Sequence, residues 1–113
     1  MKLFLFVLLL VSGAADAAVP VLGQPALRYP IVLVHGAWVG PWEFDPLVAV
    51  LRERGWEVDA LALPSVGSTS GIADDAAVIT AALDAFAEPV LLVGHSYGGV
   101  PVTEAGSHDK VER

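Results

Sequence analysis

Short apolar runs alternate with amphipathic stretches along residues 31–105 of the chain. The runs at 31–34 and 90–93 predict strands buried on both faces, and residues 56–63 predict a strand between them in the sequence. Helical spacing of apolar residues predicts a first helix with the buried stripe Phe44, Leu47, Val48 and Leu51. It predicts a second helix with the stripe Ile72, Ala76, Ile79, Leu83 and Phe86, and residues 100–105 predict a third.

This order of elements predicts an α/β fold of mainly parallel strands with helices on both faces of the sheet. With 113 residues the chain is long enough for one small domain at most. We expect that domain at 29–113, after an extended segment at 18–28 that contains prolines and a glycine.

The first 17 residues have the pattern of a secretory signal peptide. Lys2 gives a basic start, residues 3–11 are an unbroken apolar run, and Ala15 and Ala17 supply the small residues of a cleavage site. The run is well short of the roughly 20 residues that span a bilayer, so no stable membrane anchor is expected. The pattern predicts a cleaved signal peptide at 1–17 and a secreted or periplasmic protein.

Charge and composition narrow the class of partner. The formal net charge is −7 and only 17% of residues are charged, so no basic patch is available for a nucleic acid. The acidic residues are scattered and are expected to be solvated, with Asp74 and Asp75 in the first turn of the second helix, where its dipole favours them. The absence of cysteine excludes disulfides, thiolate metal sites and a cysteine nucleophile.

The stretch 94–98 reads Gly-His-Ser-Tyr-Gly and fits the pattern G-x-S-x-G between a predicted strand and a predicted helix. At such a corner the serine is held in a strained conformation with its side chain pushed out. Larger side chains at the flanking glycines would collide, which explains Gly94 and Gly98, and Gly99 follows directly. The stretch therefore predicts a nucleophile elbow with Ser96 as the catalytic residue.

A second stretch, 35–38, reads His-Gly-Ala-Trp and follows the first strand. Acyl transfer needs two hydrogen-bond donors aimed at the developing oxyanion. The backbone N–H groups of Ala37 and Tyr97 are the expected donors, with His35, Gly36 and Trp38 forming the loop around them. The three histidines share no element, so no metal site is expected. No cofactor is expected either.

The stretches PIVLVHGAW, GPWEF, LPSVGS and VLLVGHSYGG together resemble the N-terminal half of an α/β-hydrolase. The resemblance covers about residues 29–105 and is strongest to esterase-like and hydroxynitrile-lyase-like members. It implies that Ser96 is the nucleophile, that Ala37 and Tyr97 form the oxyanion hole, and that the first strand lies between the other two. Residues 62–67 depart from the Asp-x-Pro-Gly-x-Gly of many members, which should alter that loop only.

A serine nucleophile needs a histidine and a carboxylate that orients the histidine. Along an α/β-hydrolase chain the order is serine, then the carboxylate, then the histidine. The helix after Ser96 should carry Glu104 and His108 away from it, so His108 is expected to be a solvated loop residue. His95 is expected to be structural and His35 to orient the oxyanion loop. The chain is thus expected to stop before the triad acid and histidine, with residues 110–113 approaching a further strand, and to be inactive alone.

The sequence favours a serine hydrolase that acts, in its full-length form, on an ester or related acyl bond of a small molecule. A hydroxynitrile-lyase-like lyase on the same scaffold and a non-catalytic remnant remain as alternatives. Trp38, Trp42 and Tyr97 are candidates for an apolar pocket, although Trp42 and Tyr97 fit core packing equally well.

Overall fold

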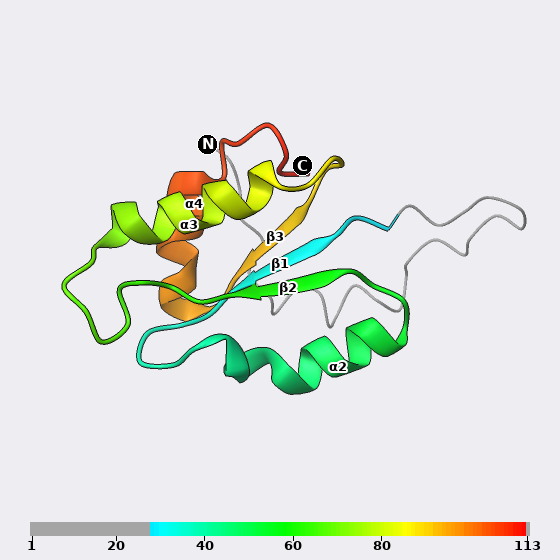
Figure 1. Ribbon diagram of the computed structural model, residues 1–113, viewed down its shortest axis with the longest axis horizontal. Coiled ribbons are helices and arrows are strands. Elements are labelled where there is room, and N and C mark those ends of the chain that lie inside the picture. The colour runs from blue at the N-terminus through cyan, green and yellow to red at the C-terminus, as the bar shows by residue number, and fades with distance from the viewer. Residues whose placement is uncertain (1–27, 113) are drawn as a thin grey trace, which may run out of the picture.

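The computed structural model describes residues 28–112, so the expected signal peptide and nearly all of the segment at 18–28 lie outside the described residues. The described part is a three-stranded parallel sheet between helices (Figure 1). The strands are β1 (Ile31–Val34), β2 (Val58–Leu61) and β3 (Leu91–Gly94). Strand β1 lies in the centre, between β2 and β3, in the order that the resemblance implied.

Three helices cover the sheet, with α2 on one face and α3 and α4 on the other (Figure 1). Helix α2 (Asp45–Glu53) follows a 3-10 turn at Pro41–Phe44, and α3 spans Ile72–Asp84. Helix α4 (Gly99–Ala105) follows a second 3-10 turn at Ser96–Gly98. The α/β fold class predicted from the sequence, with parallel strands and helices on both faces, is therefore confirmed.

Alternation along β1 divides the core into two parts because successive side chains of a strand point to opposite faces. Val32 and Val34 pack towards α3 and α4, in a buried cluster that also holds Leu61, Leu63, Ile79, Leu83, Val90, Val102 and Ala105. Ile31 and Leu33 pack towards α2, in a second cluster with Phe44, Val48, Val58 and Val93. The central strand is thus buried on both faces, as its unbroken apolar run predicts.

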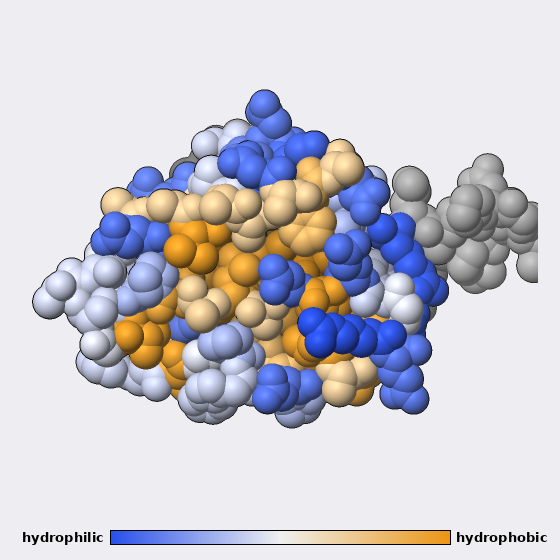
Figure 2. All heavy atoms as spheres, in the orientation of Figure 1, coloured by the Kyte–Doolittle hydropathy of each residue, from blue (hydrophilic) through white to orange (hydrophobic). Residues whose placement is uncertain are grey.

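Several details differ from the sequence-based expectation. The second strand is limited to Val58–Leu61, shorter than the predicted 56–63. Leu47 and Ile72, predicted in buried stripes, are 39% and 43% exposed. In Figure 2 apolar side chains gather on the face between α3 and α2, at the position of β2 in Figure 1.

After α4 the chain returns to the sheet beside β3. Val90 forms a parallel bridge with Val111, in which its N–H donates to the Lys110 carbonyl at 2.6 Å and its own carbonyl accepts from Glu112 at 3.0 Å. Residues 110–112 thus lie beside β3 and are joined to it by this one bridge. No helix within residues 28–112 is long and apolar enough to cross a bilayer.

Candidate active site

The loops that follow the three strands meet at one edge of the sheet. Val34, the last residue of β1, is in register with Leu61 at the end of β2 and with Gly94 at the end of β3. The carboxyl ends of parallel strands therefore lie side by side, which is where ligands bind in open α/β sheets. The stretch 35–38, the loop after β2 and the elbow all start from this edge.

Ser96 occupies a sharp corner between β3 and α4. Its φ of 53° is in the left-handed region, which costs a non-glycine residue energy and is concentrated at functional sites. A Cβ on Gly98 would lie 2.4 Å from the Val34 carbonyl oxygen, and one on Gly94 would lie 2.8 Å from the Gly98 carbonyl carbon. Both flanking glycines are thus required by backbone packing, and the Ser96 side chain is left exposed.

The loop after β1 lies directly against the elbow. A Cβ on Gly36 would be 3.3 Å from the Ser96 Cβ, so the two stretches 35–38 and 94–98 form one site. Trp38 has a φ of 67° and is 95% exposed. Trp38 and Ser96 are the two non-glycine residues with positive φ among residues 28–112, and strain is concentrated here.

His35 is held inside the site by both ring nitrogens. It is 1% exposed, its Nδ1 lies 2.8 Å from the Gly36 carbonyl oxygen, and its Nε2 accepts the Leu63 N–H at 3.1 Å. A ring whose Nε2 accepts and whose Nδ1 donates has no nitrogen left to take a proton from Ser96. The contacts instead tie the loop after β1 to the loop after β2.

Glu43 joins the elbow to the loop after β1. One of its carboxylate oxygens lies 2.7 Å from His95 Nδ1, and the other accepts the Gly36 N–H at 3.2 Å. The His95 side chain is half exposed and is directed to Glu43. His95 is therefore paired with a carboxylate on the 3-10 turn before α2.

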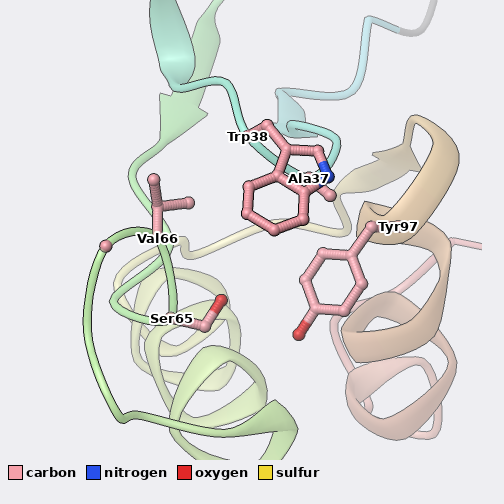
Figure 3. Close-up of a pocket in the computed structure, with 6 residues that line it drawn as sticks. Ala37, Trp38, Ser65, Val66 and Tyr97 are labelled. Carbon is pink, nitrogen blue, oxygen red and sulfur yellow. The ribbon is translucent and has the colours of Figure 1, made fainter.

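A cavity of about 230 Å³ opens beside the elbow (Figure 3). Its lining comes from all three loops and comprises Ala37, Trp38, Ser65, Val66, Gly67 and Tyr97. Ala37, Trp38 and Tyr97 were singled out from the sequence, whereas Ser96 lies next to the cavity without lining it. Trp42 is 62% exposed and belongs neither to this pocket nor to a core cluster.

Asp75 is a residue of the site that the sequence reasoning missed. It is fully buried, and it accepts hydrogen bonds from Ser65 N–H at 3.0 Å, Ser65 Oγ at 2.6 Å and Tyr97 Oη at 2.8 Å. The expectation of a solvated side chain was wrong because Asp75 lies one helical turn before Ile79, on the buried stripe of α3. That spacing is the signal by which the sequence distinguishes it from Asp74.

The contact with Asp75 changes the pKa of the Tyr97 hydroxyl. Its hydrogen bond to Asp75, with burial as a smaller cause, raises the pKa of Tyr97 above its ordinary value of about 10. The phenol donates to a carboxylate, and loss of its proton would leave two negative groups in contact. Tyr97 is thus held as a neutral phenol at the wall of the cavity.

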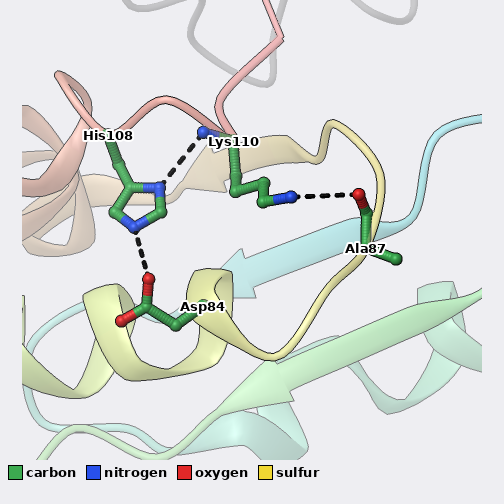
Figure 4. A network of polar contacts seen from close by, with 4 residues as sticks. All are labelled: Asp84, Ala87, His108 and Lys110. Carbon is green, nitrogen blue, oxygen red and sulfur yellow. Dashed lines mark hydrogen bonds and ion pairs between the residues drawn. The ribbon is translucent and has the colours of Figure 1, made fainter.

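His108 lies away from the elbow, in a polar network at the far end of α3 (Figure 4). Its Nε2 is 2.9 Å from Asp84 Oδ1, and its Nδ1 accepts the Lys110 N–H at 3.1 Å. His108 lies in the loop after α4, as expected, but it is not solvated, since its side chain is 19% exposed and both ring nitrogens have partners. No three histidine or carboxylate side chains gather as metal ligands anywhere in residues 28–112.

The comparisons with known proteins agree with this geometry. The sequence pattern of the alpha/beta hydrolase family matches residues 31–112, so the chain belongs to the alpha/beta hydrolase family. A carbendazim hydrolyzing esterase of Nocardioides sp. (strain SG-4G) is 35% identical over 80 residues, which are 64% of this chain and 33% of that protein. The alpha/beta hydrolase nvfD of Aspergillus novofumigatus is 33% identical over 85 residues, 70% of this chain and 34% of that protein.

A solved structure supports the same fold. Tomato methylketone synthase I, as a variant in complex with β-ketoheptanoate, superimposes with a TM-score of 0.66 at 27% sequence identity. The superposition covers 78% of this chain and 38% of that protein. The chain thus spans about a third of the length of the relatives named here.

Proposed function

We propose that this chain supplies the nucleophile and the oxyanion hole of a serine esterase that acts on small-molecule esters. The observation that carries the proposal is the position of Ser96, exposed on a positive-φ corner and next to the loop after β1, where a Cβ on Gly36 would lie 3.3 Å from the Ser96 Cβ. Such a corner presents a hydroxyl above the sheet beside a helix N-terminus, where negative charge is favoured. The esterase from Nocardioides, among the relatives, supports ester cleavage as the reaction.

The oxyanion hole is assigned to the backbone N–H groups of Ala37 and Tyr97. Among residues 28–112 neither group donates a hydrogen bond to a protein acceptor, so both are available to a ligand. Tyr97 directly follows the nucleophile, and Ala37 directly follows Gly36, on which a Cβ would lie 3.3 Å from the Ser96 Cβ. Two such donors stabilise the tetrahedral intermediate of acyl transfer by several kcal/mol in known enzymes.

The proton acceptor of Ser96 is assigned to residues outside this chain. His35 has both nitrogens bonded, His95 is paired with Glu43, and His108 is paired with Asp84. A serine hydroxyl without a base is a weak nucleophile, so we expect no turnover from residues 1–113 alone. The acid and histidine would follow Ser96 in the chain order of this fold.

Export is a separate proposal, based on the sequence of residues 1–17. Its test is to fractionate cells that express the protein and to sequence the N-terminus of the product. A mature protein that begins at Ala18, outside the cytoplasm, is the expected result. A cytoplasmic product that keeps Lys2 would overturn it.

The test of the esterase uses the protein as its own gene encodes it, including any residues beyond Arg113, alongside the 113-residue chain. We expect saturable hydrolysis of p-nitrophenyl acetate and labelling by a fluorophosphonate, both abolished by Ser96→Ala. Ser70→Ala is the matched control, since Ser70 does not line the cavity. Turnover that survives in Ser96→Ala would refute the proposal, and cleavage of a cyanohydrin but of no ester would favour the lyase.

A further inference from the structure

The cavity beside the elbow contains two hydroxyl groups, and both are bonded to the same oxygen atom. Ser65 Oγ donates to Asp75 Oδ2 at 2.6 Å, and Tyr97 Oη donates to Asp75 Oδ2 at 2.8 Å. Ser65 and Tyr97 come from different loops, and their oxygens point into the same part of the pocket (Figure 3).

The direction of these hydrogen bonds determines what the hydroxyls offer to a ligand. A carboxylate accepts hydrogen bonds and donates none, so each hydroxyl proton is committed to Asp75. What remains on Ser65 Oγ and on Tyr97 Oη is acceptor capacity alone. Two groups that are usually described as donors or acceptors are therefore restricted to accepting.

The charges around the cavity also favour a neutral ligand. The six residues that line the cavity include no charged side chain, and the fully buried Asp75 lies directly behind two of them. A carboxylate on the ligand would face the lone pairs of the two hydroxyls and the carboxylate of Asp75. No lining residue carries a positive charge that would offset this repulsion. A neutral ligand that carries a proton donor would meet two acceptors.

We propose that this cavity selects uncharged esters that carry an O–H or N–H donor, which binds between Ser65 Oγ and Tyr97 Oη. The proposal rests on the proposed function, because it names the substrate class of the same site. Asp75 is the positioning residue: it does not line the cavity, but it fixes the direction in which both hydroxyls donate.

Binding is tested apart from catalysis, with the Ser96→Ala protein and three matched probes followed by protein-observed NMR titration. The probes are methyl 4-hydroxyphenylacetate, methyl 4-methoxyphenylacetate and methyl 4-carboxyphenylacetate. The first carries a donor proton where the second carries a methyl group. We expect the hydroxyl probe to bind about fivefold more tightly than the methoxy probe, as one neutral hydrogen bond allows, and the carboxylate probe to bind most weakly.

Asp75→Asn tests the positioning role. An asparagine amide can donate to Ser65 Oγ and Tyr97 Oη, which frees their protons to face the cavity. The preference for the hydroxyl probe should then fall to about one or invert, whereas Asp74→Asn on the exposed side of α3 should leave it unchanged. Partial unfolding would weaken both probes equally, so the ratio separates positioning from a loss of structure.

The outcomes distinguish this inference from the esterase proposal. Equal binding of the hydroxyl and methoxy probes, preference for the carboxylate probe, or no binding of any probe overturns the inference, whatever the catalytic result. The full protein then provides the complementary measurement, the ratio of kcat/KM for the hydroxyl and methoxy esters. Turnover of both at equal kcat/KM leaves the esterase standing and refutes the inference, whereas selective binding without turnover refutes the esterase alone.

Discussion

The elbow after β3 and the loop after β2 adjoin one cavity, yet different forces hold them. The elbow is fixed by backbone against backbone, since a single added carbon at Gly98 would lie 2.4 Å from the Val34 carbonyl oxygen. The loop after β2 has space around Gly67, where an added carbon would meet nothing within 4 Å. It is held through two side chains, those of Asp75, which bonds Ser65 twice, and of His35, which accepts the Leu63 N–H.

The difference separates the part of the site that positions the reacting group from the part that shapes the cavity. Close backbone packing leaves Ser96 a single corner geometry whatever the substrate. A loop attached through hydrogen bonds can change its lining by changing few residues. The substitutions below test this contrast, starting with the largest expected effect.

Gly98→Ala should destabilise the protein most. The added methyl group would overlap the carbonyl oxygens of Val34 and His35, at 2.4 and 2.6 Å, so the elbow must move away from β1. We expect a loss of about 3 kcal/mol in the free energy of unfolding, measured by urea denaturation. Gly67→Ala is the control: it carries only the strain of a positive φ and should cost about 1 kcal/mol. Equal losses would contradict the proposed contrast.

Asp75→Ala should have the next largest effect on stability. It leaves the Ser65 N–H, the Ser65 hydroxyl and the Tyr97 hydroxyl without their acceptor. We expect a loss of about 2 kcal/mol, because unsatisfied buried polar groups cost more than the bond itself contributes. Asp74→Ala, which removes only the exposed acceptor of the Gly71 N–H, should cost about 1 kcal/mol or less. Thermal unfolding of the two variants side by side makes the comparison, and the reverse order would contradict the burial of Asp75.

Tyr97 should reveal its contact with Asp75 at alkaline pH. The chain has two tyrosines, so the ultraviolet absorbance of tyrosinate can be followed almost residue by residue. The raised pKa of Tyr97 predicts an ionisation step above about pH 10 that disappears in Tyr97→Phe and shifts to lower pH in Asp75→Asn.

The sign of the stability effect follows from that shift. The folded state holds the Tyr97 proton more tightly than the unfolded state, so this contribution is complete below about pH 10. It is lost as the pH rises through the pKa of Tyr97 in the folded protein. Unfolding free energies measured across this range should fall less steeply for Tyr97→Phe than for the native chain, and parallel curves would argue against the contact.

The sequence was sufficient for the elbow and insufficient for Asp75, for a physical reason. A Cβ on Gly94 would collide with the backbone of Gly98, and this short spacing reveals the elbow directly, whereas the approach of Gly98 to Val34 is long-range and is not visible in the sequence. The partners of Asp75 are Ser65 and Tyr97, 10 and 22 residues away, which become neighbours only when the loops after β2 and β3 meet. Strand order followed from the resemblance, whereas the exposure of Ile72 depends on where α3 sits against α4 and the sheet.

Glu43→Gln should produce the smallest change, because it weakens a contact at the surface of the site rather than beneath it. Glu43 pairs with His95, whose side chain is 51% exposed, while its second oxygen accepts the Gly36 N–H. Glutamine can still accept from Gly36, so only the pairing with His95 is lost. We expect a cost of about 0.5 kcal/mol in unfolding free energy, and this cost should shrink further as salt is added.

Glu43→Ala is the matched comparison. It removes both contacts and should cost about 1 kcal/mol more, since the Gly36 amide loses its acceptor. If Glu43→Gln were as costly as Glu43→Ala, the pairing of His95 and Glu43 would hold the loop after β1 to the elbow. The close packing of Gly98 against the backbone of Val34 and His35 would then be insufficient, and the contrast between a backbone-fixed elbow and a side-chain-fixed loop would fail.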